Sequence, residues 1–161
     1  MIHLLCGPTA AGKTTYAKKL IQEGNAIHFA LDELLVQTAF PASPDPAFMV
    51  GLIDQSQSHI LRILQQSETH IAQSRDVVLE IPTFRRDHRD VVRGWAAGLK
   101  QPLTLYHFSA DRTKRLERMH KRNAERGSTF SYHVPEWLFE WVDQVFEVPA
   151  ADEGAVRIDT N

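Results

Sequence analysis

The first fifteen residues constrain the fold of this chain more than any other stretch. A short apolar run from Ile2 to Cys6 ends at Gly7. Residues 7–14 then read Gly-Pro-Thr-Ala-Ala-Gly-Lys-Thr, which fills every fixed position of the phosphate-binding pattern G-x-x-x-x-G-K-[ST]. A functional loop of this kind follows a strand and opens a helix; the apolar run predicts the strand, and residues 13–22 predict the helix. These residues therefore predict a loop that binds a nucleoside triphosphate.

Each residue type in this loop has a physical role. Glycines let backbone N–H groups curl around an anion, and the helix that follows directs its positive end at the phosphates. Lys13 places a full charge on the β- and γ-phosphates, while the Thr14 hydroxyl completes the ligand shell of Mg²⁺. The predicted nucleotide-binding residues of the loop are Gly7, Pro8, Thr9, Ala10, Ala11, Gly12, Lys13, Thr14 and Thr15.

Composition excludes several classes of protein. A chain of 161 residues with 43% hydrophobic and 24% charged residues is typical of one globular domain, here residues 1–161. The formal charge of −2 argues against nonspecific nucleic-acid binding by the whole surface. Cys6 is the single cysteine, so an internal disulfide and a multi-cysteine zinc site are excluded. We expect a cytoplasmic protein, because neither a signal-peptide pattern nor a membrane span is present, and no obligate protein partner is evident.

Acidic residues follow two of the predicted strands. Asp32 lies just after the strand of residues 26–30, at the sheet edge where α/β proteins bind ligands, so it is the candidate base that takes a proton from an attacking hydroxyl. The alternative is that Asp32 or Glu33 caps the next helix. Glu80 lies near the end of the strand of residues 76–81, where an acid supports Mg²⁺ or its water shell. Thr14 and Glu80 are therefore the candidate metal ligands.

Two groups of arginines follow later strands. A predicted helix that ends near Gly98 begins with three arginines, Arg85, Arg86 and Arg89. Positive charge at the start of a helix is unfavourable to the helix dipole, so these arginines indicate an anion nearby. The alternative is solvated surface charge. After the strand of residues 103–108, the segment from Asp111 to Arg126 carries seven Lys and Arg against three acids.

Four arginines of this segment fall on one stripe of the predicted helix, at positions 115, 118, 122 and 126. Stacked like charges repel, so the stripe is expected to face an anion, and with the loop of residues 127–133 it suits a closing lid. The alternative is a basic, solvated helix. A proline-rich loop, a long helix over residues 46–74, a last helix over residues 135–146 and a strand over residues 155–158 complete the prediction. Five strands separated by helices predict an α/β fold with a parallel sheet.

These residues resemble the small P-loop kinases related to the 5′-kinase domain of polynucleotide kinase, to chloramphenicol phosphotransferase and to zeta-toxin-like kinases, a group also known as ATP-binding AAA domains. The resemblance covers nearly the whole chain. It rests on Gly7–Thr14, on Asp32, on the acid-ended strand followed by Thr83-Phe84 and Arg89, on Arg118-x-x-x-Arg122, and on Phe146-Glu147-x-Pro149.

The resemblance implies a three-layer P-loop NTPase fold of the kinase type, with strand order 2-3-1-4-5, helices on both faces and an arginine-bearing lid over about residues 112–134. It implies ATP and Mg²⁺, with transfer of the γ-phosphoryl group to a hydroxyl. Asp32 matches the general base, Lys13 and Thr14 match the phosphate and magnesium ligands, and Arg118 and Arg122 match lid arginines that contact the nucleotide. Glu80 departs from the usual Asp of this group.

The leading interpretation is a kinase whose catalytic residues are Lys13, Asp32, Arg118 and Arg122. The alternative is a nucleotide-dependent switch that hydrolyses ATP and acts through a partner. For the acceptor, a small-molecule alcohol is favoured over a nucleic-acid 5′-hydroxyl. The small alcohol needs a mostly apolar pocket, which Phe40, Phe48 and Trp95 could line. The nucleic acid needs a basic groove, to which arginines 85, 86, 89 and 93 could contribute.

Overall fold

The computed structural model describes residues 1–34, 36 and 38–161. Its centre is one parallel sheet with the order β2-β3-β1-β4-β5, which confirms the expected 2-3-1-4-5 topology. Every strand lies within one residue of the predicted bounds. The strands are β1 (Ile2–Cys6), β2 (Ala26–Ala30), β3 (Asp76–Glu80), β4 (Leu103–Ser109) and β5 (Val156–Asp159).

The apolar sequence of β1 explains its central place. All five of its residues are buried, and Leu4 lies beside Leu79 of β3 on one side and Leu105 of β4 on the other. A strand that is apolar on both faces is stable only where helices cover both sides of the sheet. The loop after Cys6 therefore emerges at the middle of the sheet's carboxyl edge, where α/β proteins bind ligands.

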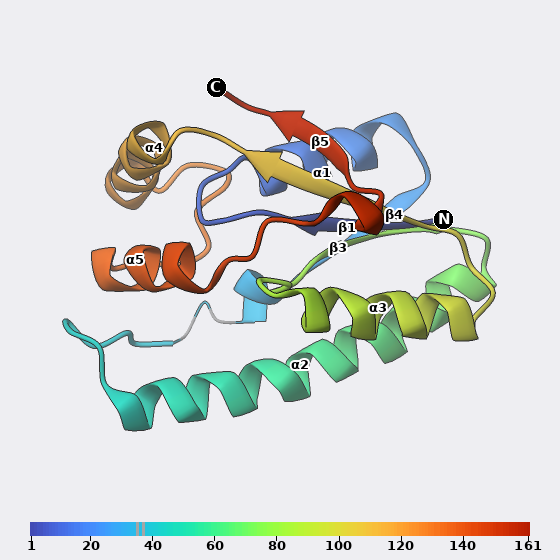
Figure 1. Ribbon diagram of the computed structural model, residues 1–161, viewed down its shortest axis with the longest axis horizontal. Helices are drawn as coiled ribbons and strands as arrows, with labels where there is room; N and C mark the ends of the chain where they lie inside the picture. The colour runs from blue at the N-terminus through green and yellow to red at the C-terminus, as the bar shows by residue number, and fades with distance from the viewer. Residues whose placement is uncertain (35, 37) are drawn as a thin grey trace.

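Helices cover both faces of this sheet and its carboxyl edge, which confirms the three-layer prediction. Figure 1 shows α1 (Lys13–Glu23) on one face, with α2 (Pro46–Ala72) and α3 (Arg86–Gly98) on the other. Beyond the carboxyl ends of the strands lie α4 (Arg112–Glu125) and α5 (Glu136–Val145). Two short 3₁₀ helices, η1 (Leu31–Leu34) and η2 (Ala151–Glu153), complete the fold. Among the described residues, no helix has both the length and the apolar character that crossing a membrane requires.

The predicted start of α2 is confirmed in detail. Asp45 is its N-cap, and the Asp45 carboxylate accepts hydrogen bonds from the backbone N–H groups of Ala47 (2.8 Å) and Phe48 (3.0 Å). Pro46 occupies the first helical position, where its missing N–H costs nothing. This cap fixes where a 27-residue helix begins, and its first turns lie near the carboxyl edge of the sheet (Figure 1).

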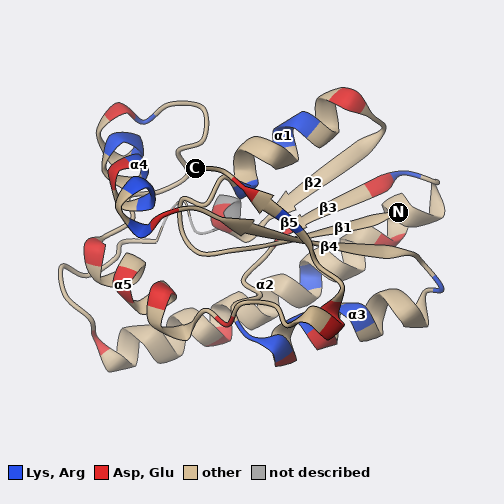
Figure 2. Cartoon of the chain, turned by 45° about the horizontal axis from the view of Figure 1, so that its top comes forward, with Lys and Arg blue, Asp and Glu red and all other residues tan. Residues whose placement is uncertain are grey.

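Arg115 joins α4, α5 and the phosphate-binding loop. It is buried, and its guanidinium makes two hydrogen bonds to Asp143 of α5, at 2.7 and 2.9 Å. The same guanidinium reaches the carbonyl of Thr9 at 3.3 Å and lies over the ring of Phe139, 5.1 Å from its centre. Figure 2, in which Lys and Arg are blue and Asp and Glu are red, shows basic positions along α4 and acidic positions along the neighbouring α5. The prediction that the whole arginine stripe faces an external anion is therefore wrong for Arg115, whose anion is Asp143.

Arg89 joins α3 to the segment that precedes β5. It is completely buried, and it donates to both carboxylate oxygens of Glu153, at 2.7 and 2.8 Å, and to the carbonyl of Glu147 at 3.0 Å. Arg86 binds Asp152 in the same bidentate way. The anions that the sequence indicated near the start of α3 are thus carboxylates of this chain. The suggestion that Arg89 could line a nucleic-acid groove is wrong, because its side chain does not reach the surface.

We expect Glu153→Gln to destabilise the protein in a pH-dependent manner. The hydrogen bonds from Arg89 hold the pKa of Glu153 at about 2, below its ordinary value of 4.5. Because the folded-state pKa is depressed, the stabilisation is fully present above about pH 4.5 and is lost as the pH falls through about 2. At pH 7 the variant leaves the Arg89 charge buried without its partner, which costs about 3–5 kcal/mol.

Urea unfolding at pH 7 and at about pH 2.5 measures this difference. The difference in the free energy of unfolding between wild type and Glu153→Gln should be large at pH 7 and much smaller at the acidic pH. Asp152→Asn is the matched control, because this carboxylate is 63% exposed and its loss should matter little. An equal gap at both pH values would contradict the assignment.

Candidate active site

The phosphate-binding loop requires glycine at two positions. At Gly7 a Cβ would lie 2.7 Å from the carbonyl oxygen of Phe108, closer than any side chain can be placed. Gly12 has a φ of 96° and forms the N-cap of α1. Between them, Ala10 adopts a left-handed φ of 60°. The loop thus curls back over the start of α1, the arrangement that presents backbone N–H groups to an anion.

Lys13 is folded onto this loop. Its ammonium donates to the carbonyls of Gly7 (2.8 Å) and Pro8 (3.0 Å). Burial lowers the pKa of Lys13; the negative charges of Glu80 and Asp32 act in the opposite direction but do not cancel the effect. A triphosphate would add the missing negative charge beside the Lys13 ammonium. Lys13 thus lies against the loop and lines the cavity, and its contact with a triphosphate stays a prediction.

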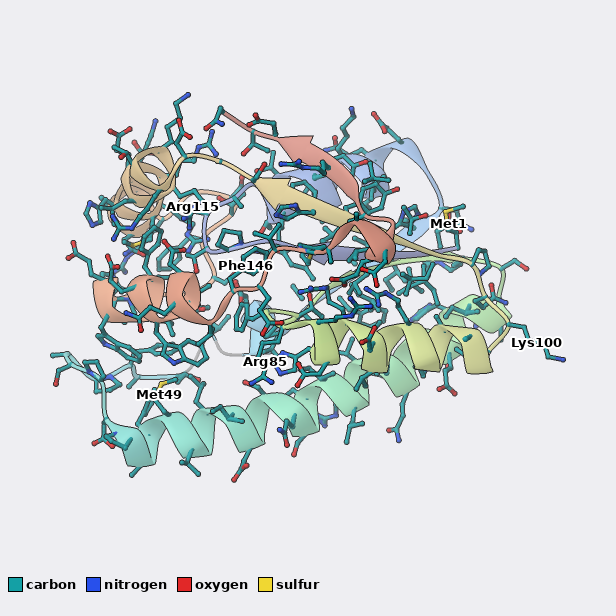
Figure 3. All side chains as sticks on the ribbon, viewed as in Figure 1. Met1, Met49, Arg85, Lys100, Arg115 and Phe146 are labelled. Atoms are coloured by element: carbon teal, nitrogen blue, oxygen red, sulfur yellow. The ribbon has the colours of Figure 1, made fainter. Side chains whose placement is uncertain are left out.

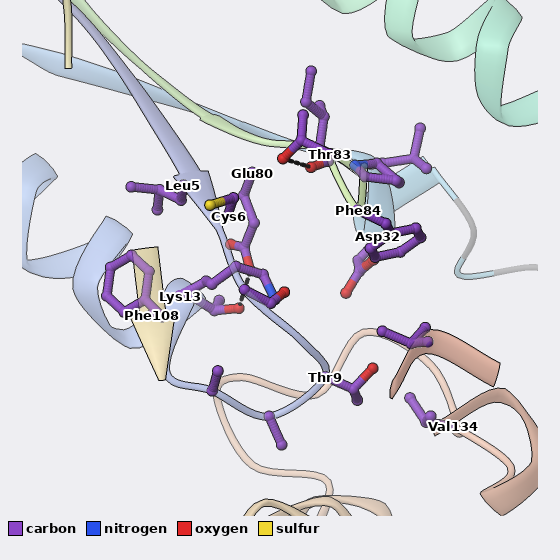
Figure 4. Close-up of a pocket in the computed structure, with 18 of the residues that line it drawn as sticks. Leu5, Cys6, Thr9, Lys13, Asp32, Glu80, Thr83, Phe84, Phe108 and Val134 are labelled. Atoms are coloured by element: carbon purple, nitrogen blue, oxygen red, sulfur yellow. Dashed lines mark hydrogen bonds between the residues drawn. The ribbon is translucent and has the colours of Figure 1, made fainter. Parts of the chain in front are cut away.

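Thr14 and Glu80 lie together, as their predicted role in metal binding requires. The Thr14 hydroxyl donates to Oε1 of Glu80 at 2.7 Å, and Oε2 lies 3.1 Å from Nε2 of His28 (Figure 4 shows the Thr14 contact as a dashed line). Burial acts to raise the pKa of Glu80, but the His28 hydrogen bond, the Lys13 charge and the Thr14 hydrogen bond outweigh it and keep the pKa below its ordinary value. An ionised carboxylate beside a hydroxyl is the all-oxygen donor set that Mg²⁺ prefers. These residues fit the ion.

His28 was not predicted from the sequence. It lies in the middle of β2, it is nearly buried, and it belongs to no motif. Its contact with Glu80 follows from the pairing of β2 with β3, in which Ala30 lies opposite Glu80. The only signal in the sequence was a histidine inside an otherwise apolar strand. We interpret His28 as the residue that orients the Glu80 carboxylate.

Asp32 lies in η1, directly after β2, at the predicted edge of the sheet. It lines the same cavity as Lys13, and Figure 4 shows these two side chains facing one space from opposite sides. Asp32 stands inside the 3₁₀ helix rather than before it, and the cap of α2 is Asp45. The side chain of Glu33 lies outside the described ones.

Two of the four arginines in the stripe line the cavity. Arg118 donates to the hydroxyl of Thr160 at 3.1 Å and also binds the Thr160 carbonyl, while the Thr160 hydroxyl lies 3.1 Å from the carbonyl of Ala11. Arg122 faces the cavity too, and its buried Nε has no hydrogen-bond partner among the described residues. Arg126 instead lies over the ring of Phe130 at the end of α4. Arg118 and Arg122 thus line the same cavity as Lys13, and their role as lid arginines that contact a nucleotide stays a prediction.

The cavity that contains these residues measures about 1100 Å³. Of the predicted nucleotide-binding residues only Pro8 does not line it; the Pro8 carbonyl accepts a hydrogen bond from Lys13. Phe40 lines the cavity as predicted, but Phe48 does not: its ring packs against that of Phe40, with the ring centres 5.6 Å apart. Trp95 was wrongly predicted to line it: its indole N–H donates to Glu68, and its ring packs on the hydrophobic core between α2 and α3.

The fold and the site define a P-loop nucleotide-binding protein of the kinase type. A family model described as "AAA domain" matches residues 2–149, so the chain belongs to that family. A search of the curated proteins gives no match.

Solved structures share the fold at low sequence identity. A sugar kinase from Janibacter sp. HTCC2649 superposes with a TM-score of 0.63 at 16% identity, over 98% of this chain and 84% of that chain. Kti12 from Chaetomium thermophilum in complex with ADP-AlF3 gives 0.67 at 14% identity, over 100% and 90%. A gluconokinase from Sinorhizobium meliloti 1021 gives 0.61 at 17% identity, over 98% and 81%. These likenesses establish the fold, and the acceptor has to be argued from this chain's own residues.

We expect Thr160→Val to weaken ATP binding through Arg118. The substitution removes the hydroxyl that holds Arg118 against the loop, and one such hydrogen bond corresponds to about a two- to tenfold change in affinity. Titration with a fluorescent ATP analogue measures the dissociation constant. Thr104→Val, which removes a hydroxyl outside the cavity, is the control. Arg118→Ala should lose affinity, and adding Thr160→Val to it should cause no further loss; additive losses would contradict the coupling.

Proposed function

We propose that this protein is an ATP-dependent phosphotransferase that moves the γ-phosphoryl group of ATP to a hydroxyl, with a small-molecule alcohol favoured over a nucleic-acid 5′-hydroxyl as the acceptor. The observation that carries the proposal is a single cavity in which Lys13 and Asp32 face the same space and which continues past Asp32 along α2. A site that only hydrolyses ATP needs room for water, whereas this cavity has a second compartment beside the candidate base. We place the reaction in the cytoplasm, a proposal that the single buried Cys6 supports.

In this proposal the phosphate-binding loop holds the triphosphate, and the charge is neutralised from two sides. Lys13 approaches from α1, and Arg118 and Arg122 approach from α4. Arginines suit this position because they stabilise charge on the transferring group and its leaving oxygen. Thr14 and Glu80 would hold Mg²⁺, which neutralises phosphate charge when bound. His28 keeps the Glu80 carboxylate turned toward Thr14.

Asp32 then acts as the base. Its carboxylate accepts the proton of the acceptor hydroxyl, the hydroxyl oxygen forms a bond to the γ-phosphorus, and the bond from that phosphorus to the bridging oxygen of ADP breaks. Tyr132 cannot compete for this role, because burial and the negative charge of Asp32 raise its pKa well above the ordinary value. The Tyr132 hydroxyl therefore stays protonated and is available as a donor.

The charges around the site support a small acceptor over a nucleic acid. Arg85, Arg86 and Arg93 are each paired with carboxylates of this chain, and Arg89 is buried. The last helix near the cavity, α5, carries Glu136, Glu140 and Asp143 and no basic residue. A phosphate backbone would meet little free positive charge at α3 and α5.

We expect Asp32→Asn to retain ATP binding and to lose about 10²- to 10⁴-fold in transfer rate, because a positioned base contributes that much. Lys13→Ala should lose both binding and transfer. The assay follows label from γ-labelled ATP with Mg²⁺ onto an acceptor panel. Asp54→Asn, the same change at an exposed residue of α2, is the control and should be fully active.

Two results would contradict parts of this proposal. Full turnover by Asp32→Asn would remove Asp32 from the mechanism. Steady phosphate release with no labelled acceptor, at ordinary enzyme rates, would favour the alternative of a nucleotide-dependent switch that acts through a partner.

A further inference from the structure

The cavity divides into two compartments of different chemistry. Every lysine and arginine that lines it among the described residues comes from α1 or α4. The described residues of α2, α3 and α5 that line it include no lysine or arginine, and α5 contributes only Leu138, Trp141 and Val142. The basic side chains thus surround the loop that binds the triphosphate. The other compartment offers no lysine or arginine for a carboxylate or a phosphate on the acceptor, and its only basic side chain among the described residues is His88 of α3, which lies 3.8 Å from Asp87.

The second compartment is walled mainly by apolar side chains. The helix α2 lies along it, and Met49 projects from α2 on the side that faces α5 (Figure 3). Eight residues of α2 line the cavity, and Ser56 and Gln57 are the only polar ones among them. A polyhydroxylated molecule such as a sugar would lose most of its hydrogen bonds to water here without replacing them, which is costly. An apolar body gains from the same burial.

Large apolar side chains are exposed at the mouth of this compartment. Ile53, Leu61 and Val91 line the cavity and are still 43%, 62% and 64% exposed. Ile53 and Leu61 lie on α2, and Val91 lies on α3. A cluster of exposed apolar residues at a binding cleft marks surface that a ligand covers. A ligand with an apolar body would cover these three side chains.

The inner end of the compartment carries the groups that can position a hydroxyl. Asp32 and Tyr132 both line the cavity, and the Tyr132 ring stacks on Phe40 with the ring centres 4.9 Å apart and the planes 17° from parallel. The stacked rings add a flat apolar wall. The Tyr132 hydroxyl can donate a hydrogen bond to the oxygen of the acceptor hydroxyl, while Asp32 accepts the proton of that hydroxyl. One polar end and one long apolar wall define the shape of the acceptor.

We propose that the acceptor is an uncharged alcohol whose reacting hydroxyl is carried on an apolar, aromatic or aliphatic body, bound between α2, α3 and α5 with its hydroxyl at Asp32 and Tyr132. This inference rests on the proposed phosphotransferase function and names its substrate class. The acceptor O–H proton passes to Asp32, a new O–P bond forms, the bond to ADP breaks, and a phosphate monoester is released.

The test uses the full chain and 2-(2-naphthyl)ethanol, a fluorescent uncharged alcohol, as both ligand and acceptor. Binding is measured by naphthyl fluorescence, and transfer by label from γ-labelled ATP with Mg²⁺. The comparison compounds are the same alcohol with a ring sulfonate, glucose, gluconate, thymidine and a 5′-hydroxyl oligonucleotide. We expect label on the uncharged naphthyl alcohol, and at least about tenfold less on each of the others.

Val91→Asn and Val50→Asn are the matched variants. Both valines are exposed on the surface, at 64% and 61%, but only Val91 lines the cavity. Val91→Asn should raise the KM for the naphthyl alcohol about three- to tenfold, in keeping with the loss of an apolar contact, and should leave the KM for ATP unchanged. Val50→Asn should change neither value.

The outcomes separate this inference from the function on which it rests. Label on glucose, gluconate, thymidine or the oligonucleotide in preference to the naphthyl alcohol would overturn the inference and leave the phosphotransferase standing. No label on any compound, with naphthyl binding that Val91→Asn weakens, would overturn the phosphotransferase and keep a site for apolar alcohols. Neither label nor naphthyl binding would overturn both.

Discussion

A charge can be buried in a protein only beside a partner of opposite charge, and this constraint determines which basic residues of the chain remain for a nucleotide. Arg89 and Arg115 are both buried, and both are satisfied by carboxylates from the second half of the chain, Glu153 and Asp143. The Arg89–Glu153 pair joins α3 to η2, and the Arg115–Asp143 pair joins α4 to α5. Arg118 and Arg122, one and two turns further along α4 from Arg115, are the arginines that line the cavity.

The parts of the molecule that local patterns determine were predictable. The apolar run, the glycines and Lys13 predict β1, the loop and α1, because each requirement lies within about fifteen residues. The strand order came from the resemblance to known kinases, and the structure confirms it. Asp32 was predicted from its place after a strand, and the structure does bring it to the cavity of Lys13.

Contacts between distant residues account for what the sequence did not reveal. Helical spacing places Arg115 and Arg118 on one stripe, but Asp143, 28 residues away, decides that Arg115 is structural. Thr160 reaches Ala11 across 149 residues, and no local pattern marks it. Trp95 was rightly placed on the apolar side of its helix but wrongly expected to line the acceptor pocket, because its partner Glu68 belongs to another helix. Periodicity indicates that one face is buried, but it does not identify the element that buries it.

The contact between Thr160 and Ala11 also couples the nucleotide site to the edge of the sheet. β5 is an edge strand with mostly exposed side chains, the kind of element that opens locally before the rest of a domain unfolds. Thr160, the residue directly after β5, hydrogen-bonds to Ala11 of the loop and to Arg118, so opening of β5 would remove both contacts. A ligand that binds the site only while β5 is paired with β4 then stabilises the paired state of β5 by the free energy of its binding. Ligand binding would thus keep β5 paired with the sheet and slow the exchange of the β5 amide hydrogens with solvent.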